Sequence, residues 1–418
     1  MVKNPTVWVK IMNETSRVFL SVIKAAVHAE QPQLQKNITP QQWHELFHMA
    51  TIHNVLPLFY EAISRQLPLS ADPRLLSAMK QKMRQQIILQ TIRTAEFLEL
   101  NDRMLAAGVK PMVVKGIVCR SLYAKPDHRP SSDEDVLIPA EDFEICHRIL
   151  TDFGMAAQGQ AGTYEVPYFK SSSTLYIELH KSLFPPENEA YGDLNRFFAN
   201  AQAQAATVEL QGHTVYTLAP TDHLFYLICH AFKHFLHSGF GIRQVCDIAL
   251  YANAYGSQAD WAQILKNCRA IRADKFAAAV FMIGKNHLGF EIPHIWQTTE
   301  VDELPMLTDL LEAGVYGGAS MSRKHSSNIT LDALAAQKSG RKAKGGFVTS
   351  AFPSASKLQE RYPYLKKHRY MLPVAWASRL WTYARESHGR RDNNAADALK
   401  IGAERVELLK LYGIVETK

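Results

Sequence analysis

Apolar residues recur every three or four positions through residues 10–107, which is the spacing of one face of a helix. Thr39 followed by Pro40 is typical of a helix start, because threonine caps the first free amides and proline fits the first turn. Residues 73–107 contain no glycine or proline after the first position and end at Gly108, a residue suited to a helix C-terminus. The pattern predicts a helical N-terminal region that finishes in one long helix.

After Gly108 the period of the apolar positions changes from about four to two, which predicts strands. A helix is expected over residues 140–153, directly after Pro139, and Gln211-Gly212 is typical of a hairpin turn. The predicted strands cover residues 112–114, 134–138, 164–169, 175–180, 207–210 and 213–218.

Helical spacing returns from Thr221, the expected N-cap of its first helix, and continues to about residue 288. Residues 314–356 are rich in glycine, serine and lysine and predict a long flexible loop, and the last amphipathic helix should end near Gly413. The expected organisation is a helical region (1–108), a sheet domain (109–219), a helical domain (220–313), the loop (314–356) and a helical extension (357–418).

The composition is that of a globular chain with several cores, with 418 residues of which 47% are hydrophobic. The first residues lack the apolar stretch of a signal peptide, and no run approaches the ~18 apolar residues that span a bilayer. We therefore expect a cytoplasmic protein without a membrane partner. Five cysteines without a Cys-x-x-Cys pair predict reduced core thiols, of which Cys229 and Cys246 are candidates to line a site.

The positive charge is concentrated at the C-terminal end. From residue 301 onward there are 19 lysines and arginines against 12 aspartates and glutamates, a net charge of +7, whereas the first 300 residues hold 28 of each. Basic clusters at residues 341–344 and 361–369 suit an anionic partner such as nucleic acid. A solvated basic face is the favoured interpretation, because no nucleic-acid-binding motif accompanies the charge.

Asp133 and Asp135 are the candidate metal ligands. They lie two residues apart where the 134–138 strand begins, so both carboxylates face one side of the sheet. Two like charges so close need a cation between them, and a hard divalent ion prefers oxygen ligands. Asp-x-Asp also occurs in ordinary surface turns, but here Glu178 on a later strand supplies the third carboxylate of a two-metal phosphoryl-transfer site.

The Lys115-Gly116 turn is the candidate phosphate contact. It joins a short buried strand to the start of a helix, where backbone N–H groups and the helix dipole favour an anion. His180, two residues after Glu178, is expected on the same strand face, either orienting that carboxylate or contacting a phosphate.

Three motifs occur in the order Val114-Lys-Gly116, Arg129-Pro-Ser-Ser-Asp-Glu-Asp-Val-Leu-Ile-Pro139 and Glu178-Leu-His180. The sequence here resembles the uncharacterised nucleotidyltransferase family, a branch of the DNA polymerase beta-like nucleotidyltransferase superfamily. The likeness extends over roughly residues 20–290, through the segments 227–234 and 243–249.

The resemblance implies an α+β fold with a mixed sheet flanked by helices, and a nucleoside triphosphate with two Mg²⁺ ions at one sheet edge. ATP is the expected donor and Mn²⁺ an alternative ion. Asp133, Asp135 and Glu178 would hold the metals, and Gly116 would lie under the triphosphate. The superfamily usually has Gly-Ser at this turn, so Lys115 is expected to replace the serine hydroxyl as a point charge.

Glu134 departs from the pattern, because this position is normally apolar in the superfamily, and it should point away from the metals. Glu178 stands where aspartate is commoner. The implied reaction transfers a nucleoside monophosphate to a hydroxyl group of a small molecule, a protein or RNA, with release of pyrophosphate, and no motif selects the acceptor.

Four histidines, His223, His230, His234 and His237, form one stripe on the helix that starts near residue 221. Packing explains histidines of this kind in many helices. The functional interpretation is that the stripe, with His230 and His234 in it and Lys233 or Arg243 nearby, faces the sheet and contacts phosphates or the acceptor. Arg129, which opens the aspartate motif, is a further candidate for the nucleotide.

Two other functions compete with the transferase. A degenerate module would keep the fold and bind a nucleotide or a partner without turnover, which the missing hydroxyl at the Lys115-Gly116 turn favours. A metal-dependent phosphohydrolase would use the histidine stripe and Asp247, but Asp247 is four residues after Arg243 and is expected to pair with it.

Overall fold

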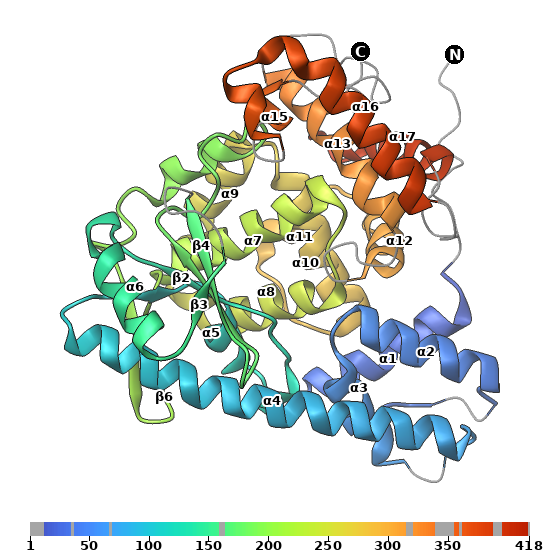
Figure 1. Ribbon diagram of the computed structural model, residues 1–418. Helices are drawn as coiled ribbons and strands as arrows, with labels where there is room; N and C mark the ends of the chain where they lie inside the picture. The colour runs from blue at the N-terminus through green and yellow to red at the C-terminus, as the bar shows by residue number, and fades with distance from the viewer. Residues whose placement is uncertain are drawn as a thin grey trace.

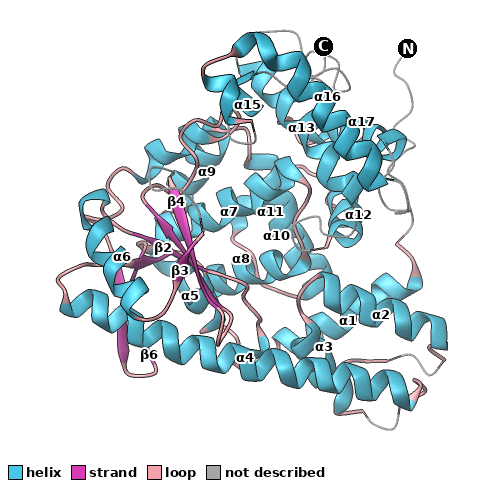
Figure 2. Ribbon diagram, in the orientation of Figure 1, coloured by secondary structure: helices cyan, strands magenta, loops and turns pink. Residues whose placement is uncertain are grey.

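The structure is a computed structural model that describes residues 12–34, 37–66, 69–158, 164–314, 321–338, 355–358, 362–387 and 395–416. Figure 1 shows a mixed sheet on one side of the molecule, a helical body beside it, and the C-terminal helices at the far end. Figure 2 separates the helices from the strands and shows that helices surround the sheet. The predicted α+β architecture is confirmed.

The N-terminal region is helical, as predicted. Its helices are α1 (Glu14–Val27), α2 (Pro40–Ile52), α3 (Leu56–Ser64) and α4 (Pro73–Ala106). Thr39 caps α2 in a capping box with Gln42, and Asp72 accepts the Arg74 N–H at the start of α4. Helix α4 is about 51 Å long at ~1.5 Å per residue, and it runs beneath both the sheet and the first three helices (Figure 1).

The sheet has seven strands in the order β3-β4-β5-β2-β1-β7-β6. They are β1 (Met112–Val113), β2 (Glu134–Leu137), β3 (Ala156–Ala157), β4 (Glu165–Lys170), β5 (Leu175–His180), β6 (Ala206–Leu210) and β7 (His213–Thr217). All predicted strands are confirmed with small shifts at their ends. Strand β3 was not predicted, because two exposed residues give no periodic signal.

The centre of the sheet places the motifs beside one another. Strand β2 is parallel to β5, and β1 is antiparallel to β2 and parallel to β7. After β1 the chain turns into the short helix α5 (Gly116–Arg120), and after β2 it continues through a 3₁₀ turn into α6 (Phe143–Asp152).

The second helical part follows the sheet. It consists of α7 (Pro220–His237), α8 (Ile242–Tyr255), α9 (Trp261–Ala270), α10 (Asp274–Leu288), α11 (His294–Gln297) and α12 (Leu304–Ala313). The predicted N-cap at Thr221 is wrong: α7 begins one residue earlier, at Pro220, whose missing N–H suits the first helical position. The Thr221 hydroxyl instead accepts the Asp260 N–H at 2.9 Å, at the start of α9.

The predicted loop over residues 314–356 contains a helix, α13 (Met321–Lys338). This segment has no glycine or proline of its own, so the glycine-rich stretches on either side misled the composition-based prediction. Helix α13 packs against α7 and α17. Arg323 donates to Asp309 at 2.5 Å and to the Ser238 carbonyl at 2.6 Å, which ties α13 to α12 and to the end of α7.

The C-terminal extension is helical, with α15 (Ala355–Leu358), α16 (Leu372–Ser387) and α17 (Ala395–Leu411). Helix α17 ends close to Gly413, as expected, and Leu408 and Leu409 are buried. The basic cluster at 341–344 lies outside the described residues. Among the described helices, none combines the length and apolar composition that crossing a membrane requires. The five cysteines are buried free thiols.

His223 fastens α7 to the sheet. The Thr217 hydroxyl donates to the Val113 carbonyl at 2.6 Å, so it accepts from the protonated Nδ1 of His223 at 3.0 Å. Burial lowers the pKa of His223 to about 3. The ring is therefore neutral in the folded protein and serves as a packing residue, one of the two interpretations of the histidine stripe.

We expect His223 to make the protein acid-sensitive. In the unfolded chain a histidine has a pKa of about 6.5. Because the folded pKa is lower, its stabilising contribution is present above pH 6.5 and is lost as the pH falls. Between pH 7.5 and pH 5.5 this one residue should cost about 1.4 kcal/mol, and His223→Asn should reduce the pH dependence by that amount.

Urea unfolding at pH 7.5 and pH 5.5 measures this difference in the free energy of unfolding. His44→Asn is the matched control, since His44 is an exposed histidine on α2. An equal drop in wild type and in His223→Asn would contradict the prediction.

Candidate active site

Three polar side chains converge where β2 and β5 run side by side. Asp135 on β2 is the register partner of Glu178 on β5, and in parallel strands both side chains face the same side of the sheet. One atom each of Asp135, Glu178 and His180 lies within 4.8 Å of the others, a spacing that suits a single metal ion. The structure thus brings together two of the three predicted carboxylates and His180, which was expected on the strand face of Glu178.

Asp133 lies directly before β2 and joins this group through Lys115. The Lys115 ammonium nitrogen is 2.7 Å from Asp135 Oδ2 and 3.6 Å from Asp133 Oδ2. The side chain of Lys115 is 5% exposed and that of Asp135 is 4% exposed, whereas Asp133 and Glu178 are 15% and 26% exposed. The group is therefore closed on the Lys115 side and open to solvent at Asp133 and Glu178.

The charges of the group depend on one another. Burial alone would raise the pKa of Asp135, but Lys115 and His180 outweigh it and hold that pKa well below its usual value. Burial would lower the pKa of His180, yet Asp135 and Glu178 raise it to about 9, so the ring is charged at neutral pH. The pKa of Glu178 is raised, chiefly by burial and also by the neighbouring aspartates.

Glu134 points to the opposite face of β2, as predicted. Its carboxylate accepts the Ile117 N–H at 2.8 Å and an Arg120 N–H at 2.5 Å, and both charged side chains are buried. A Cβ on Gly116 would lie 1.7 Å from Glu134 Oε2, and Gly116 has a φ of +41°. The Ile117 N–H, the second amide of α5 and one of those expected to face a phosphate, is thus already bound by Glu134.

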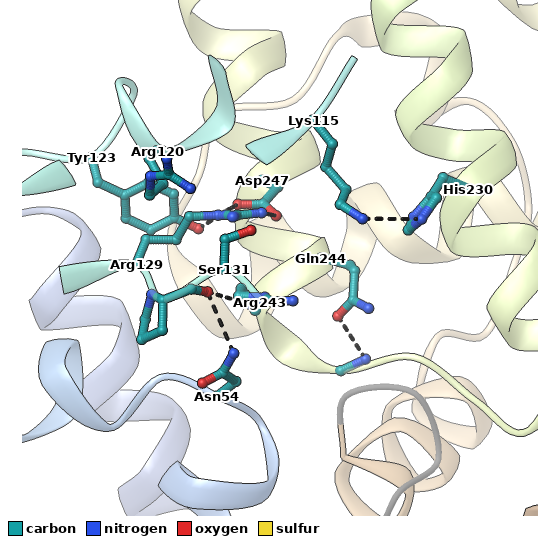
Figure 3. Close-up of polar contacts among 12 residues, drawn as sticks. Asn54, Lys115, Arg120, Tyr123, Arg129, Ser131, His230, Arg243, Gln244 and Asp247 are labelled. Atoms are coloured by element: carbon teal, nitrogen blue, oxygen red, sulfur yellow. Dashed lines mark hydrogen bonds and ion pairs between the residues drawn. The ribbon is translucent and has the colours of Figure 1, made fainter. Parts of the chain in front are cut away.

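The loop between α5 and β2 is held by buried charge. Figure 3 shows Arg129 pointing at Asp247, with the Tyr123 ring beside them. Arg129 donates to the two Asp247 oxygens at 2.9 and 2.5 Å, and the Tyr123 hydroxyl donates to the same carboxylate at 2.8 Å. Burial would raise the pKa of Asp247, but Arg129, with a smaller effect from Arg243, lowers it. Arg243 was the expected ion-pair partner of Asp247, but in the structure Asp247 forms its ion pair with Arg129.

The two residues after Arg129 are fixed by several helices. The Pro130 carbonyl accepts from Asn54 at 3.4 Å and from Arg243 (Figure 3). Ser131 donates its N–H to Gln90 at 2.7 Å, and its carbonyl accepts from Arg93 at 3.1 Å.

Sequence reasoning missed Asn54, Gln90 and Arg93. Gln90 and Arg93 lie 41 and 38 residues from Ser131 along the chain, so no local spacing marks them. Their only sequence signal is the presence of polar residues along a helix that packs against the sheet. Together with Arg243 and Asp247 they position the start of the aspartate motif.

The remaining histidines of the stripe divide between two places. His230 accepts from the Lys115 ammonium at 3.4 Å, and His234 lies 3.4 Å from the same ring nitrogen. Burial, with Lys115 and Lys233 adding to it, keeps the pKa of both rings well below the usual value, so both are neutral. His237 is elsewhere, hydrogen-bonded to the Tyr191 hydroxyl at 2.7 Å.

The residues present fit a hard divalent cation. Asp133, Asp135 and Glu178 supply carboxylate oxygens, the preferred ligands of Mg²⁺. Asp133 Oδ1 is buried and has no hydrogen-bond partner among the described residues, so it has lone pairs available. Within the described residues, no group of three potential ligands includes the α7 histidines or Asp247, which leaves the phosphohydrolase hypothesis without structural support.

Gly116→Ala should destabilise the fold strongly. The new methyl group would displace the Glu134 carboxylate from its two buried hydrogen bonds, at a cost of roughly 2–4 kcal/mol beyond backbone strain. Gly108→Ala is the matched control, because Gly108 has a φ of +84° but open space around its Cβ position. That control should cost only about 1–2 kcal/mol.

Chemical denaturation of both variants gives the comparison. In a Glu134→Ala background, the extra cost of Gly116→Ala should disappear. Equal losses for Gly116→Ala and Gly108→Ala would show that the overlap with Glu134 is unimportant.

Asp247→Asn should cost about 3–5 kcal/mol, because it leaves the buried Arg129 charge without its partner. The double variant Arg129→Met with Asp247→Asn should recover part of this loss in the free energy of unfolding. Glu99→Gln is the control: its pair with Arg103 is equally short at 2.5 Å but about half exposed, and its loss should cost less than about 1 kcal/mol. Similar losses at the two sites would contradict the prediction.

One comparison with known proteins identifies a family for this chain. The model of a family described as uncharacterised nucleotidyltransferase matches residues 39–289, more than half of the chain. No curated protein and no solved structure matches the sequence. The match covers α2 to α10, and so includes the whole sheet and every residue of the carboxylate group. The chain belongs to the uncharacterised nucleotidyltransferase family.

Proposed function

We propose that the protein transfers a nucleoside monophosphate from a nucleoside triphosphate to a hydroxyl group of an acceptor, in a reaction that depends on Mg²⁺. The observation that carries the proposal is the pairing of Asp135 with Glu178 across parallel strands, with Asp133 at the same edge. Family membership supports the same class of reaction.

Asp133, Asp135 and Glu178 would hold the divalent ions. When bound, such ions activate a hydroxyl nucleophile and neutralise the leaving pyrophosphate. The acceptor oxygen would bond to the α-phosphorus while the bond from that phosphorus to the bridging oxygen breaks and pyrophosphate leaves.

Glu178 Oε2 is the proposed acceptor of the hydroxyl proton. Glu178 is the most exposed carboxylate of the group and lies on its open side, where an acceptor hydroxyl can approach it. His180, 3.6 Å away, would orient it.

Lys115 and the neutral imidazoles of His230 and His234 are the proposed contacts for the triphosphate, since they line the buried side of the carboxylate group. For Arg129 and Arg243 we propose a positioning role, because both are 1% exposed and hold the loop that carries Asp133. Contact of Arg129, Arg243 or Gly116 with the nucleotide stays a prediction, as do ATP as donor, Mn²⁺ as alternative ion, the nature of the acceptor and the cytoplasmic location.

A second candidate is a degenerate module that binds a nucleotide without transferring it. Two observations favour it: the Lys115 ammonium lies close to both aspartates, and Glu134 accepts the Ile117 N–H in the first turn of α5. In both places a side chain of the protein already occupies a position that metal ions or nucleotide phosphates would occupy in a transferase. The two candidates differ in turnover, which can be measured directly.

The test compares wild type with Asp135→Asn and Glu178→Gln, with and without Mg²⁺, using ATP, CTP, GTP and UTP. We expect nucleotide binding and slow pyrophosphate release in wild type, and a loss of release of at least about 100-fold in both variants, as for groups that act in the transition state. Glu144→Gln, an exposed carboxylate on α6, is the matched control and should behave as wild type.

The outcomes separate the candidates. Binding that needs Asp135 but yields no pyrophosphate with any nucleotide would favour the degenerate module. Pyrophosphate release that survives in both variants would refute the assignment of the site.

A further inference from the structure

Lys115 occupies the centre of the carboxylate group. Its ammonium nitrogen lies 2.7 Å from Asp135 Oδ2, 3.4 Å from His230 Nε2 and 3.6 Å from Asp133 Oδ2. It reaches this place from the end of β1, as the residue that precedes α5. Figure 3 shows the extended side chain directed at His230, between the sheet and α7.

The aspartates of the group already have a cation of the protein beside them. The Lys115 ammonium is 2.7 Å from Asp135 and 3.6 Å from Asp133, so it relieves the repulsion between the two aspartates without an external ion. A divalent ion on the same Asp135 oxygen would be brought close to the ammonium, and two cations at such a distance repel strongly in a buried setting. Metal and lysine therefore compete for the same carboxylates.

The length of its side chain allows the Lys115 ammonium to leave the aspartates. Lysine is a compact charge on a flexible four-carbon stem, so its ammonium can move while the backbone stays fixed. A new anion is needed in exchange, because a buried ammonium without a partner is costly. The open side of the group, at Asp133 and Glu178, is where such an anion can approach.

We propose that Lys115 is an internal counter-cation that holds the carboxylates in the absence of nucleotide and releases them to divalent metal when a triphosphate replaces its partners. The inference rests on the proposed function and adds the order of binding: metal enters with the nucleotide and not before it. Lys115 would thus prevent the site from binding metal ions on their own.

The experiment uses the full chain and Mn²⁺ alone, without nucleotide. Bound Mn²⁺ is measured by the loss of the free-ion signal in electron paramagnetic resonance, and melting temperature is measured with and without the metal. Wild type should bind Mn²⁺ weakly and show little shift in melting temperature. Lys115→Met should bind Mn²⁺ roughly tenfold or more tightly, in the usual range of coupling between two ligands of one site.

Lys115→Met should also melt at a lower temperature than wild type without metal, and recover when Mn²⁺ is added, because the metal replaces the missing charge. The gain should vanish in the double variant Lys115→Met with Asp135→Asn. Lys170→Met is the matched control, since Lys170 is also paired, with Glu96 at 2.8 Å, but away from the carboxylates. It should leave Mn²⁺ binding unchanged.

Lys115→Gln, which keeps an N–H donor for Asp135 without the charge, replaces Lys115→Met if that variant does not fold. Unchanged or weaker Mn²⁺ binding in the uncharged variant would overturn the inference, even if wild type transfers nucleotide. Conversely, a wild type that neither binds nucleotide nor releases pyrophosphate would overturn the proposed function, while a gain of Mn²⁺ affinity in the Lys115 variant would still establish the counter-cation.

Discussion

The buried ion pair between Arg129 and Asp247 fixes the segment on which the candidate site depends. It joins positions 118 residues apart and is closed to solvent on both sides. Taking both charges out of water costs about as much as their attraction returns, so the pair is better understood as a constraint than as a source of stability. Its bidentate geometry sets the direction in which the chain leaves α5 and enters β2. The hydrogen bonds of Pro130 and Ser131 fix the backbone that follows, and so help to set the position of Asp133.

Strand β2 has a charged residue on each face, and the two ends of α5 supply a cation for each of them. Asp135 meets Lys115 on one face, and Glu134 meets Arg120 on the other. Lys115 directly precedes α5 and Arg120 is its last residue. Gly116, the first residue of α5, allows the Glu134 carboxylate to approach the backbone. A carboxylate at position 134, unusual for the superfamily that the sequence resembles, is therefore accommodated by the matching Arg120 and by the absence of a side chain at 116.

Local patterns carried most of the fold prediction. The alternation in 175–180 and 213–218 and the unbroken helical spacing of 73–107 depend on neighbours in sequence, so they predict β5, β7 and α4 well. The prediction from composition was wrong for residues 314–356, because it averaged glycine-rich stretches with the glycine-free segment between them that forms α13. The site could be predicted only where the spacing of residues shows which face of a strand they occupy. This was the case for Asp135 and Glu178. Partners brought in by tertiary packing, such as Gln90 and Arg93 of α4, have no such signal.

The aspartate motif predicts that a cation is needed, but not which one. Two carboxylates on one strand face repel each other whatever their function, and an ammonium, an imidazolium or a divalent metal can each relieve the repulsion. In this structure Lys115 and His180 do so from positions 20 residues before and 45 residues after Asp135. Two aspartates that already have a lysine beside them have little reason to bind a metal ion by themselves. The site gains a metal ion only if an anion compensates the displaced lysine, and a triphosphate carries enough negative charge to pair with both the lysine and the metal.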